Sequence, residues 1–239
     1  MQEKKWAITV GNLLFKYRSY FFVPILALLI IFTRPQMSLG SVTADTLFDF
    51  IGFLLALVGF FIRAVVIGYK KPGTSGRGTN IDVKEVITDG MYQVCRNPLY
   101  LANFLMWLGL TVMWWEIHFF VVIVGFFAIE YFFIIKAEES YLSSKFGAVY
   151  DNYKKLVPAF FPKIRNFKKP DRPFNWDKVL KNETNLLLLL LIFPFLFNVY
   201  EHKISLRSTG LIVFVSIVLI CWAINFYHVK KTEELRQRK

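Results

Sequence analysis

The chain has 239 residues, of which 55% are hydrophobic, 18% aromatic and 19% charged, and its mean hydropathy is +0.44. The apolar residues fall in blocks long enough to cross a bilayer core of about 30 Å, and a water-soluble core of this size could not absorb them. The composition therefore excludes a soluble globular domain. It predicts an all-α fold, a polytopic transmembrane helical bundle of about six spans with cytoplasmic helical segments.

The predicted spans follow one another along the chain with short and long intervals. The clearest is 47–69, which carries Asp49 near one end and Arg63 inside. Two spans around Glu116 are joined so closely that only a hairpin can connect them. The remaining spans come before the first long loop or after the basic segment. In chain order, the six spans are 17–32, 47–69, 99–115, 117–135, 185–200 and 210–229.

Lysine and arginine predict the orientation of these spans, because positively charged loops near span ends stay cytoplasmic. Only Arg34, Lys203 and Arg207 fall on the opposite side. Both termini and the two long loops are therefore assigned to the cytoplasm, in a bacterial inner membrane or alternatively the endoplasmic reticulum. The net charge of +12 fits attraction to anionic lipid headgroups, at about 1 kcal/mol per basic residue, better than nucleic-acid binding.

Three parts of the chain are distinguished by this pattern. An N-terminal tail and first span precede a core of three spans that carries two patterned cytoplasmic segments. A basic linker, two further spans and a tail follow the core. The boundaries are 1–46, 47–165 and 166–239.

The first patterned segment, 88–104, joins the second span to the third. Pro98 disfavours helix at the residue before it and suits the first turn of the span that follows. Arg96, Asn97 and Tyr100 are then expected at the membrane surface around a helix N-terminus, where the dipole and free N–H groups favour an anion. The alternative is an interfacial anchor, a common role for Tyr and Arg.

The second patterned segment, 136–162, continues directly from the fourth span. Glu138 and Glu139 lie where that helix leaves the bilayer. Adjacent residues of a helix point about 100° apart, so at most one of the two carboxylates is expected to face any given site. The alternative is an amphipathic helix that lies on the membrane with a solvated charged face.

Aromatic residues continue this second segment. Tyr141, Lys145 and Tyr153 can share neighbouring faces of one helix, provided that the helix persists through Gly147.

Two ionisable residues, Arg63 and Glu130, lie inside predicted spans. Such groups are costly in a bilayer and usually pair with a partner or face a polar cavity. A structural ion pair or snorkelling to an interface is the alternative to a functional role. The three histidines and two cysteines form no Ser-His-Asp or Cys-His arrangement, and neither a disulfide nor a metal site is expected.

The two patterned segments together resemble the isoprenylcysteine carboxyl methyltransferase and phospholipid methyltransferase superfamily of integral membrane enzymes. With the span before them, they cover roughly 47–162. Asn97 stands where eukaryotic carboxyl methyltransferases have His, and the last two spans lie outside the matched core. The residues that carry the resemblance are Gly90, Tyr92, Arg96, Asn97, Pro98 and Tyr100, then Glu138, Glu139, Leu142, Phe146, Gly147, Tyr150, Tyr153, Val157 and Pro158.

The resemblance implies methyl transfer from S-adenosylmethionine to a lipid or lipidated acceptor at the cytoplasmic face, without an obligate protein partner or a metal. An anionic oxygen is the expected acceptor, since an activated methyl needs alignment and not deprotonation of such a group. The implied catalytic residues are Arg96, Glu138 and Glu139. The implied cofactor-binding residues are Tyr92, Arg96, Asn97, Pro98, Tyr100, Glu138, Glu139, Tyr150, Tyr153 and Leu156, and the expected acceptor-binding residues are Arg63, Lys154 and Lys155.

Three alternatives to this function stay open on the sequence. A phospholipid amine could be the acceptor, provided that its proton were lost to water or to Glu138. A membrane reductase related to sterol reductases would require NADPH. A lipid-binding protein without enzymatic activity would ignore S-adenosylmethionine.

Overall fold

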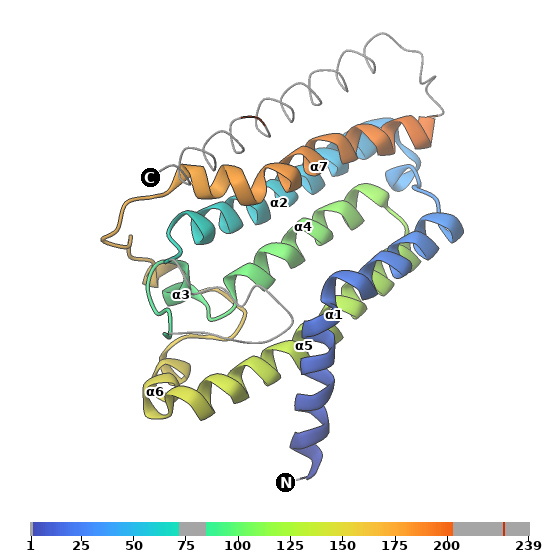
Figure 1. The fold of residues 1–239 in the computed structure, drawn as a ribbon. Coiled ribbons are helices and arrows are strands. Elements are labelled where there is room, and N and C mark those ends of the chain that lie inside the picture. Colours follow the sequence, from blue (N-terminus) through green and yellow to red (C-terminus); the bar gives the residue numbers. More distant parts are fainter. Residues whose placement is uncertain (1, 72–84, 203–226, 228–239) are drawn as a thin grey trace.

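The computed structural model describes residues 2–71, 85–202 and 227 (Figure 1). Within these ranges the chain is made of helices and loops and contains no strand, as the sequence predicts. The described elements are α1 (Gln2–Phe32), η1 (Ser38–Gly40), α2 (Val42–Gly68), α3 (Met91–Val94), α4 (Pro98–Trp114), α5 (Ile117–Phe146), α6 (Ala148–Leu156), η2 (Ile164–Asn166) and α7 (Trp176–His202).

The long helices form a bundle in which α2 packs closely against α4, α7 packs against α2, and α1 crosses α5 (Figure 1). Contacts place them in the order α7, α2, α4, α5, α1. Helices α2 and α5 are long and apolar enough to cross a membrane, and α4 is a shorter apolar helix. The protein is therefore a membrane helical bundle. The predicted span 210–229 lies outside the described residues, apart from Tyr227.

Two predicted helix starts differ from those in the structure. α1 begins at Gln2 and α7 at Trp176, because hydropathy marks only the apolar part of a helix that continues into polar residues. At α7 the start has a local cause. The Asn175 side-chain carbonyl accepts a hydrogen bond from the Lys178 backbone N–H at 2.8 Å, which satisfies one of the free donors of the first turn.

The predicted hairpin between α4 and α5 is confirmed, and a capping interaction explains where it turns. Trp115 adopts a positive φ of 46° and ends α4. The Glu116 carboxylate then accepts a hydrogen bond from the Phe119 backbone N–H at 2.7 Å, which starts α5. Trp114 and Phe119 stack at 4.8 Å between ring centroids across the turn and join the two helices.

Glycines allow α2 and α4 to approach closely, as small residues do at the interfaces of membrane helices. A Cβ atom added to Gly59 would lie 2.5 Å from the carbonyl oxygen of Ala102, and one added to Gly52 would lie 2.5 Å from that of Gly109. Both obstacles are backbone atoms, which cannot move aside as the end of a side chain can. The α2–α4 contact therefore depends on the absence of side chains at these positions.

We expect Gly59→Ala to lower the free energy of unfolding by about 1–3 kcal/mol, as for an overpacked core. Gly125→Ala is the matched control, because a Cβ atom at that helical glycine would meet nothing within 4 Å. Thermal unfolding in the same detergent compares the two variants. Equal melting temperatures for Gly59→Ala and the wild type would show that the helices separate at little cost.

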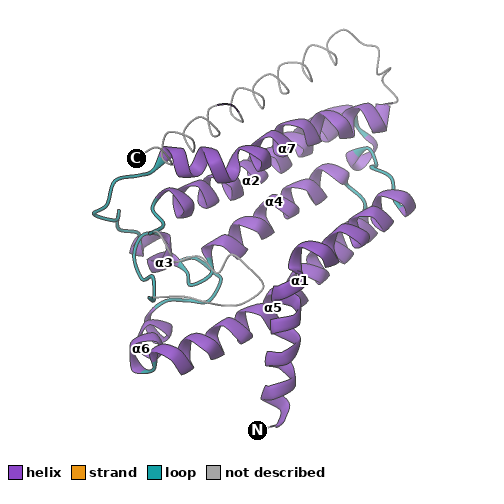
Figure 2. Cartoon of the chain, in the orientation of Figure 1, coloured by secondary structure: helices purple, strands orange, loops and turns teal. Residues whose placement is uncertain are grey.

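Loops and short elements gather at one end of the bundle, where α3, α6 and η2 lie near the start of α4 and the end of α2 (Figure 2). The helix does not persist through Gly147, contrary to the condition placed on the second segment. Gly147 has a φ of 53°, a conformation that glycine adopts easily, and α6 begins after it in a new direction. Before this break, Lys145 donates to the Tyr141 hydroxyl at 3.0 Å. After it, Tyr153 contacts Tyr92 instead.

Candidate active site

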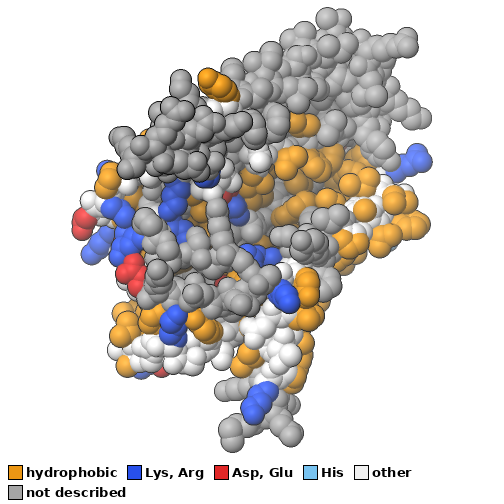
Figure 3. Space-filling model, in the orientation of Figure 1, with side chains coloured by type: hydrophobic (Ala, Val, Ile, Leu, Met, Phe, Trp, Pro, Cys, Tyr) orange, Lys and Arg blue, Asp and Glu red, His pale blue; other side chains and the backbone are white. Residues whose placement is uncertain are grey.

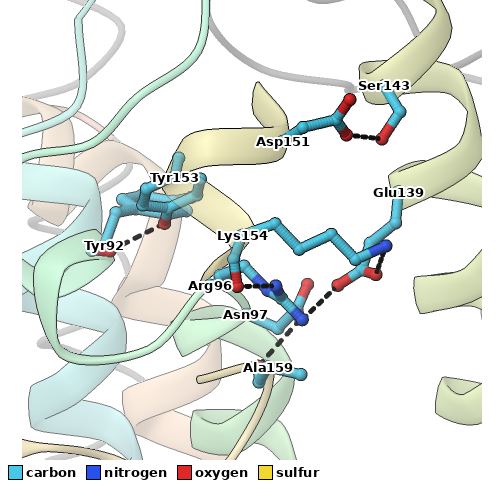
Figure 4. Close-up of polar contacts among 9 residues, drawn as sticks. All are labelled: Tyr92, Arg96, Asn97, Glu139, Ser143, Asp151, Tyr153, Lys154 and Ala159. Atoms are coloured by element: carbon cyan, nitrogen blue, oxygen red, sulfur yellow. Dashed lines mark hydrogen bonds and ion pairs between the residues drawn. The ribbon is translucent and has the colours of Figure 1, made fainter. Parts of the chain in front are cut away.

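The two patterned segments meet at this end of the bundle through their backbones. The Arg96 N–H donates a hydrogen bond to the Pro158 carbonyl at 2.9 Å. The Asn97 side-chain amide donates to the Ala159 carbonyl, also at 2.9 Å (Figure 4). Residues of the first segment are thus fixed against a stretch more than fifty positions later in the chain, so the two segments that the sequence analysis expects to build one site lie together.

Arg96 lies at the centre of the polar contacts between the two segments. Its Nη1 donates to the Lys154 backbone carbonyl at 2.8 Å, and its Nη2 lies 2.8 Å from Glu139 Oε1 (Figure 4). Lys154 Nζ lies 2.9 Å from the other oxygen of the same carboxylate. The Arg96 and Glu139 side chains are only 10% and 13% exposed, so their pair is screened by water less than a surface ion pair.

The pair leaves hydrogen-bonding capacity unused. Within the described ranges, the buried Arg96 Nε has no hydrogen-bond partner. Glu139 Oε1 likewise receives no aligned hydrogen bond there, although it contacts the guanidinium. Buried polar atoms are nearly always satisfied, so such atoms call for an explanation. A bound ligand with one anionic and one cationic group would supply it.

Glu138, the neighbour of Glu139, faces a different partner. Its carboxylate lies near the Tyr100 hydroxyl on α4. The Tyr100 ring in turn stacks on Tyr131 at 4.7 Å between centroids. The prediction that the two carboxylates cannot face one point agrees with this divergence. Glu139 pairs with Arg96 and with Lys154 of α6, whereas Glu138 lies toward α4.

Three tyrosines pack beside the ion pair. Tyr153 donates its hydroxyl hydrogen bond to the Tyr92 carbonyl at 2.7 Å (Figure 4), and its ring centroid lies 5.9 Å from that of Tyr150. Burial raises the pKa of Tyr92, Tyr150 and Tyr153 well above the usual phenol range. The three phenols therefore stay neutral at physiological pH and can act as hydrogen-bond donors and apolar walls.

Two predicted residues differ in placement from this buried cluster. Leu156 is 73% exposed and lies outside it, because the last turn of α6 directs that side chain away from the tyrosines. Lys155 is also exposed. Pro98, in contrast, is fully buried at the first position of α4, as predicted.

Arg63, which the sequence analysis expects to bind the acceptor together with Lys154 and Lys155, has polar partners different from those of Arg96. Its Nε and Nη2 form a two-fold contact with the Glu183 carboxylate at 2.8 and 3.0 Å, and its Nη1 donates to Asn103 at 2.6 Å. Glu183 is 1% exposed. Sequence reasoning missed this partner, because it placed Glu183 before the span that begins at 185. The rule that buried charges pair could have found it.

Cys95 is fully buried next to Arg96. Burial raises the pKa of its thiol to about 11, so the thiol stays protonated near neutral pH and is no nucleophile. In the part of the chain that the structure describes, no three His, Cys, Asp or Glu side chains come together in a way that could hold a metal ion.

Comparisons with known proteins find relatives that are similar to about half of the chain. The chain is 34% identical over 118 residues to the nickel-cobalt-cadmium resistance protein NccN of Alcaligenes xylosoxydans xylosoxydans, over 49% of this chain and 50% of that protein. It is equally identical, over 118 residues, to the cobalt-zinc-cadmium resistance protein CzcN of Cupriavidus metallidurans, over 49% of each chain. The chain thus spans about half the length of these curated relatives. No solved structure matches it.

The family comparison covers α2 to α5, the helices that carry the first part of the site. Residues 48–149 match the phospholipid methyltransferase family. This range runs from the first turns of α2 to the start of α6 and includes Arg96, Glu138 and Glu139. It lies within the predicted core 47–165. Through this core, the chain is similar to the phospholipid methyltransferase family, which is part of the isoprenylcysteine and phospholipid methyltransferase superfamily of membrane methyltransferases.

Proposed function

We propose that the protein transfers a methyl group from S-adenosylmethionine to an anionic oxygen, a carboxylate or a phosphate, of a lipid or lipidated acceptor at the cytoplasmic face of its membrane. The observation that carries this proposal is the poorly aligned and nearly buried pair of Arg96 and Glu139. It lies where the two segments of a methyltransferase family core meet.

The chemistry of this pair fits the methionine part of the cofactor, which carries one carboxylate and one ammonium. Arg96 would bind the carboxylate through its unused Nε and an Nη, as a planar fork of donors. Glu139 would bind the ammonium. In this way each member of the pair would exchange its partner for a ligand group of the same charge, so that no buried charge is left alone.

The neighbouring residues fit the rest of the cofactor. Tyr150 and Tyr153 present a buried aromatic wall that suits the adenosine. Tyr92 and Pro98 fix the position of that wall and of the helix start beside it. The Asn97 side-chain amide donates to the Ala159 carbonyl and so orients the backbone. As an amide, it does not titrate.

The bound cofactor supplies a methyl group already activated on a sulfonium. The residues of the chain therefore have to align an acceptor and exclude water, and an anionic oxygen needs no base for this step. Lys154 and Lys155 are the cations beside the site that can attract such an acceptor. Arg63 is not among them, because Glu183 and Asn103 already engage its guanidinium.

A phospholipid amine is the second candidate acceptor, and Glu138 favours it. Its carboxylate belongs to the residue next to Glu139 and lies near the Tyr100 hydroxyl, so it is a proton acceptor close to the site. An ammonium group must lose a proton before it can attack a methyl group. Replacement of Glu138 would then reduce turnover much more for an amine acceptor than for an anionic oxygen.

The decisive experiment is transfer of a radiolabelled methyl group from S-adenosylmethionine in native membranes, followed by extraction to identify the labelled lipid or protein. Absence of S-adenosylmethionine binding and of any labelled product would contradict the proposal.

Two measurements test the two carboxylates: binding of S-adenosylmethionine and turnover in the methyl-transfer assay. We expect Glu139→Gln to weaken S-adenosylmethionine binding by about 1.5–3 kcal/mol, as for a lost hydrogen bond to a charged group. Glu138→Gln should act mainly on turnover. Glu85→Gln is the control, since that carboxylate is 47% exposed in an ion pair with Lys71. Negligible effects of both Glu138→Gln and Glu139→Gln would remove the carboxylates from the site.

A further inference from the structure

We propose that residues 155–169, here called the basic apron, dock onto the anionic phospholipid headgroups of the bilayer that holds the chain, directly beside the active site. The apron begins in the last turn of α6 and includes η2. It belongs to neither of the two helices that are long and apolar enough to cross a membrane. Most of its exposed side chains are large apolar or basic, and the two kinds are interspersed along the segment.

The apolar side chains of the apron are exposed to an extent that water alone does not favour. Phe161 is 84% exposed, and Ile164 is 75% exposed. The preceding Phe160, in contrast, is partly buried and packs its ring 5.8 Å from that of Phe104 in the bundle. Of these neighbouring phenylalanines, one packs into the bundle and the other is exposed, although their rings remain 6.1 Å apart between centroids. Exposed apolar groups of this size mark contact surfaces for another molecule or a membrane.

The charge of the apron selects an anionic surface. No Asp or Glu occurs between Asp151 and Asp171. Figure 3 shows Lys and Arg side chains gathered at the end of the bundle that carries α3 and α6. Aromatic and aliphatic groups that enter the headgroup region, together with basic groups that remain near the phosphates, are the combination that holds a segment on an anionic bilayer. The basic side chains of the apron are Lys155, Lys163, Arg165, Lys168 and Lys169.

The backbone of the apron is attached to the site. The Lys163 N–H donates to the Val94 carbonyl at 3.0 Å, and the Pro158 carbonyl accepts the Arg96 N–H. The carbonyl of Ala159 accepts from Asn97. Headgroups that contact the apron are therefore held next to Arg96 and Lys154. This juxtaposition makes the apron a device that keeps acceptor lipids at the entrance of the site.

The docking is tested without any turnover. A polarity-sensitive dye is attached to Ile164→Cys in a Cys221→Ser background, while Cys95 is fully buried. The labelled full chain is placed in nanodiscs of phosphatidylcholine, with or without phosphatidylglycerol. We expect a blue-shifted emission that lipid-borne quenchers reduce, and a larger effect with phosphatidylglycerol. The matched site Asn152→Cys, exposed on α6, should show neither change.

Charge is tested by the double variant Lys168→Gln/Lys169→Gln, with Lys5→Gln/Lys16→Gln as a control that removes the same charge from α1. The apron variant should lose the preference for phosphatidylglycerol over phosphatidylcholine. We expect the apparent affinity of the apron for anionic lipid to fall by about fivefold for each charge removed. The control should keep it. Emission at position 164 that does not respond to lipid composition or to quenchers would overturn the proposal.

A second measurement depends on the proposed function. With radiolabelled S-adenosylmethionine, Lys168→Gln/Lys169→Gln should raise the KM for the acceptor lipid and leave cofactor affinity unchanged. Docking at position 164 without methyl transfer by the wild type would contradict the methyltransferase proposal and support the apron. Methyl transfer that is equal in neutral and anionic nanodiscs, together with unresponsive emission, would contradict the apron alone.

Discussion

Replacing Arg96 with lysine should abolish most methyl transfer and leave the fold intact. The guanidinium engages the Lys154 carbonyl and the Glu139 carboxylate at the same time, and its Nε remains for a ligand. A lysine ammonium keeps the charge but has no planar fork, so it cannot make these contacts together. We expect a loss of about 1.5–3 kcal/mol in binding of S-adenosylmethionine, the range for hydrogen bonds to charged groups.

The measurement compares wild type, Arg96→Lys and Arg96→Ala for cofactor affinity and for turnover at saturating cofactor. A fall in affinity assigns Arg96 to the cofactor, and a fall in turnover alone assigns it to the acceptor. Arg165→Lys is the matched control, because Arg165 is exposed on η2. If Arg96 were only an interfacial anchor, lysine would snorkel as well as arginine, and full activity of Arg96→Lys would establish that role.

Much of the bundle could be predicted from the sequence, because apolar blocks and turn residues act locally. The α4–α5 hairpin follows from the polar break at Glu116, and the start of α4 follows from Pro98. The first residues of α1 and α7 could not be predicted in this way. There the helix continues beyond its apolar part, and a side-chain cap such as Asn175 decides the boundary. Gly147 shows the same limit, since a glycine permits a helix break without requiring one.

The site was predicted as a set of segments more successfully than as a set of contacts. Both patterned segments meet, but the sequence does not show that Arg96 pairs with Glu139 and Lys154. Such pairing depends on the crossing of α5 over α4 and on the turn at Gly147, which are tertiary features. Leu156 was assigned by resemblance, and its exposed position shows that one turn of helix separates a buried tyrosine from a solvent-facing neighbour.

Removal of the Arg63 side chain should lower the free energy of unfolding by about 3–5 kcal/mol, the usual cost of removing one partner of a buried ion pair. Glu183 is 1% exposed and would keep a charge without its two-fold contact. Arg63→Met and Glu183→Leu should each lower the unfolding temperature in detergent. The double variant should recover most of the loss, since neither charge is then left alone.

The exposed pair of Lys71 and Glu85, at 46% and 47% exposure, provides the control for this cycle. Lys71→Met should cost less than about 1 kcal/mol, as surface ion pairs do. The same variants also decide between a structural and an acceptor-binding Arg63. A structural role predicts that the stabilised double variant transfers methyl groups with an acceptor KM close to that of the wild type. An acceptor role predicts that KM rises in Arg63→Met and stays high in the double variant, because restored packing cannot replace a lost cation. The two-fold contact with Glu183, a residue of the helix that follows the family core, favours the structural role: Arg63 attaches α7 to α2 and so fixes the wall of the bundle beside the site.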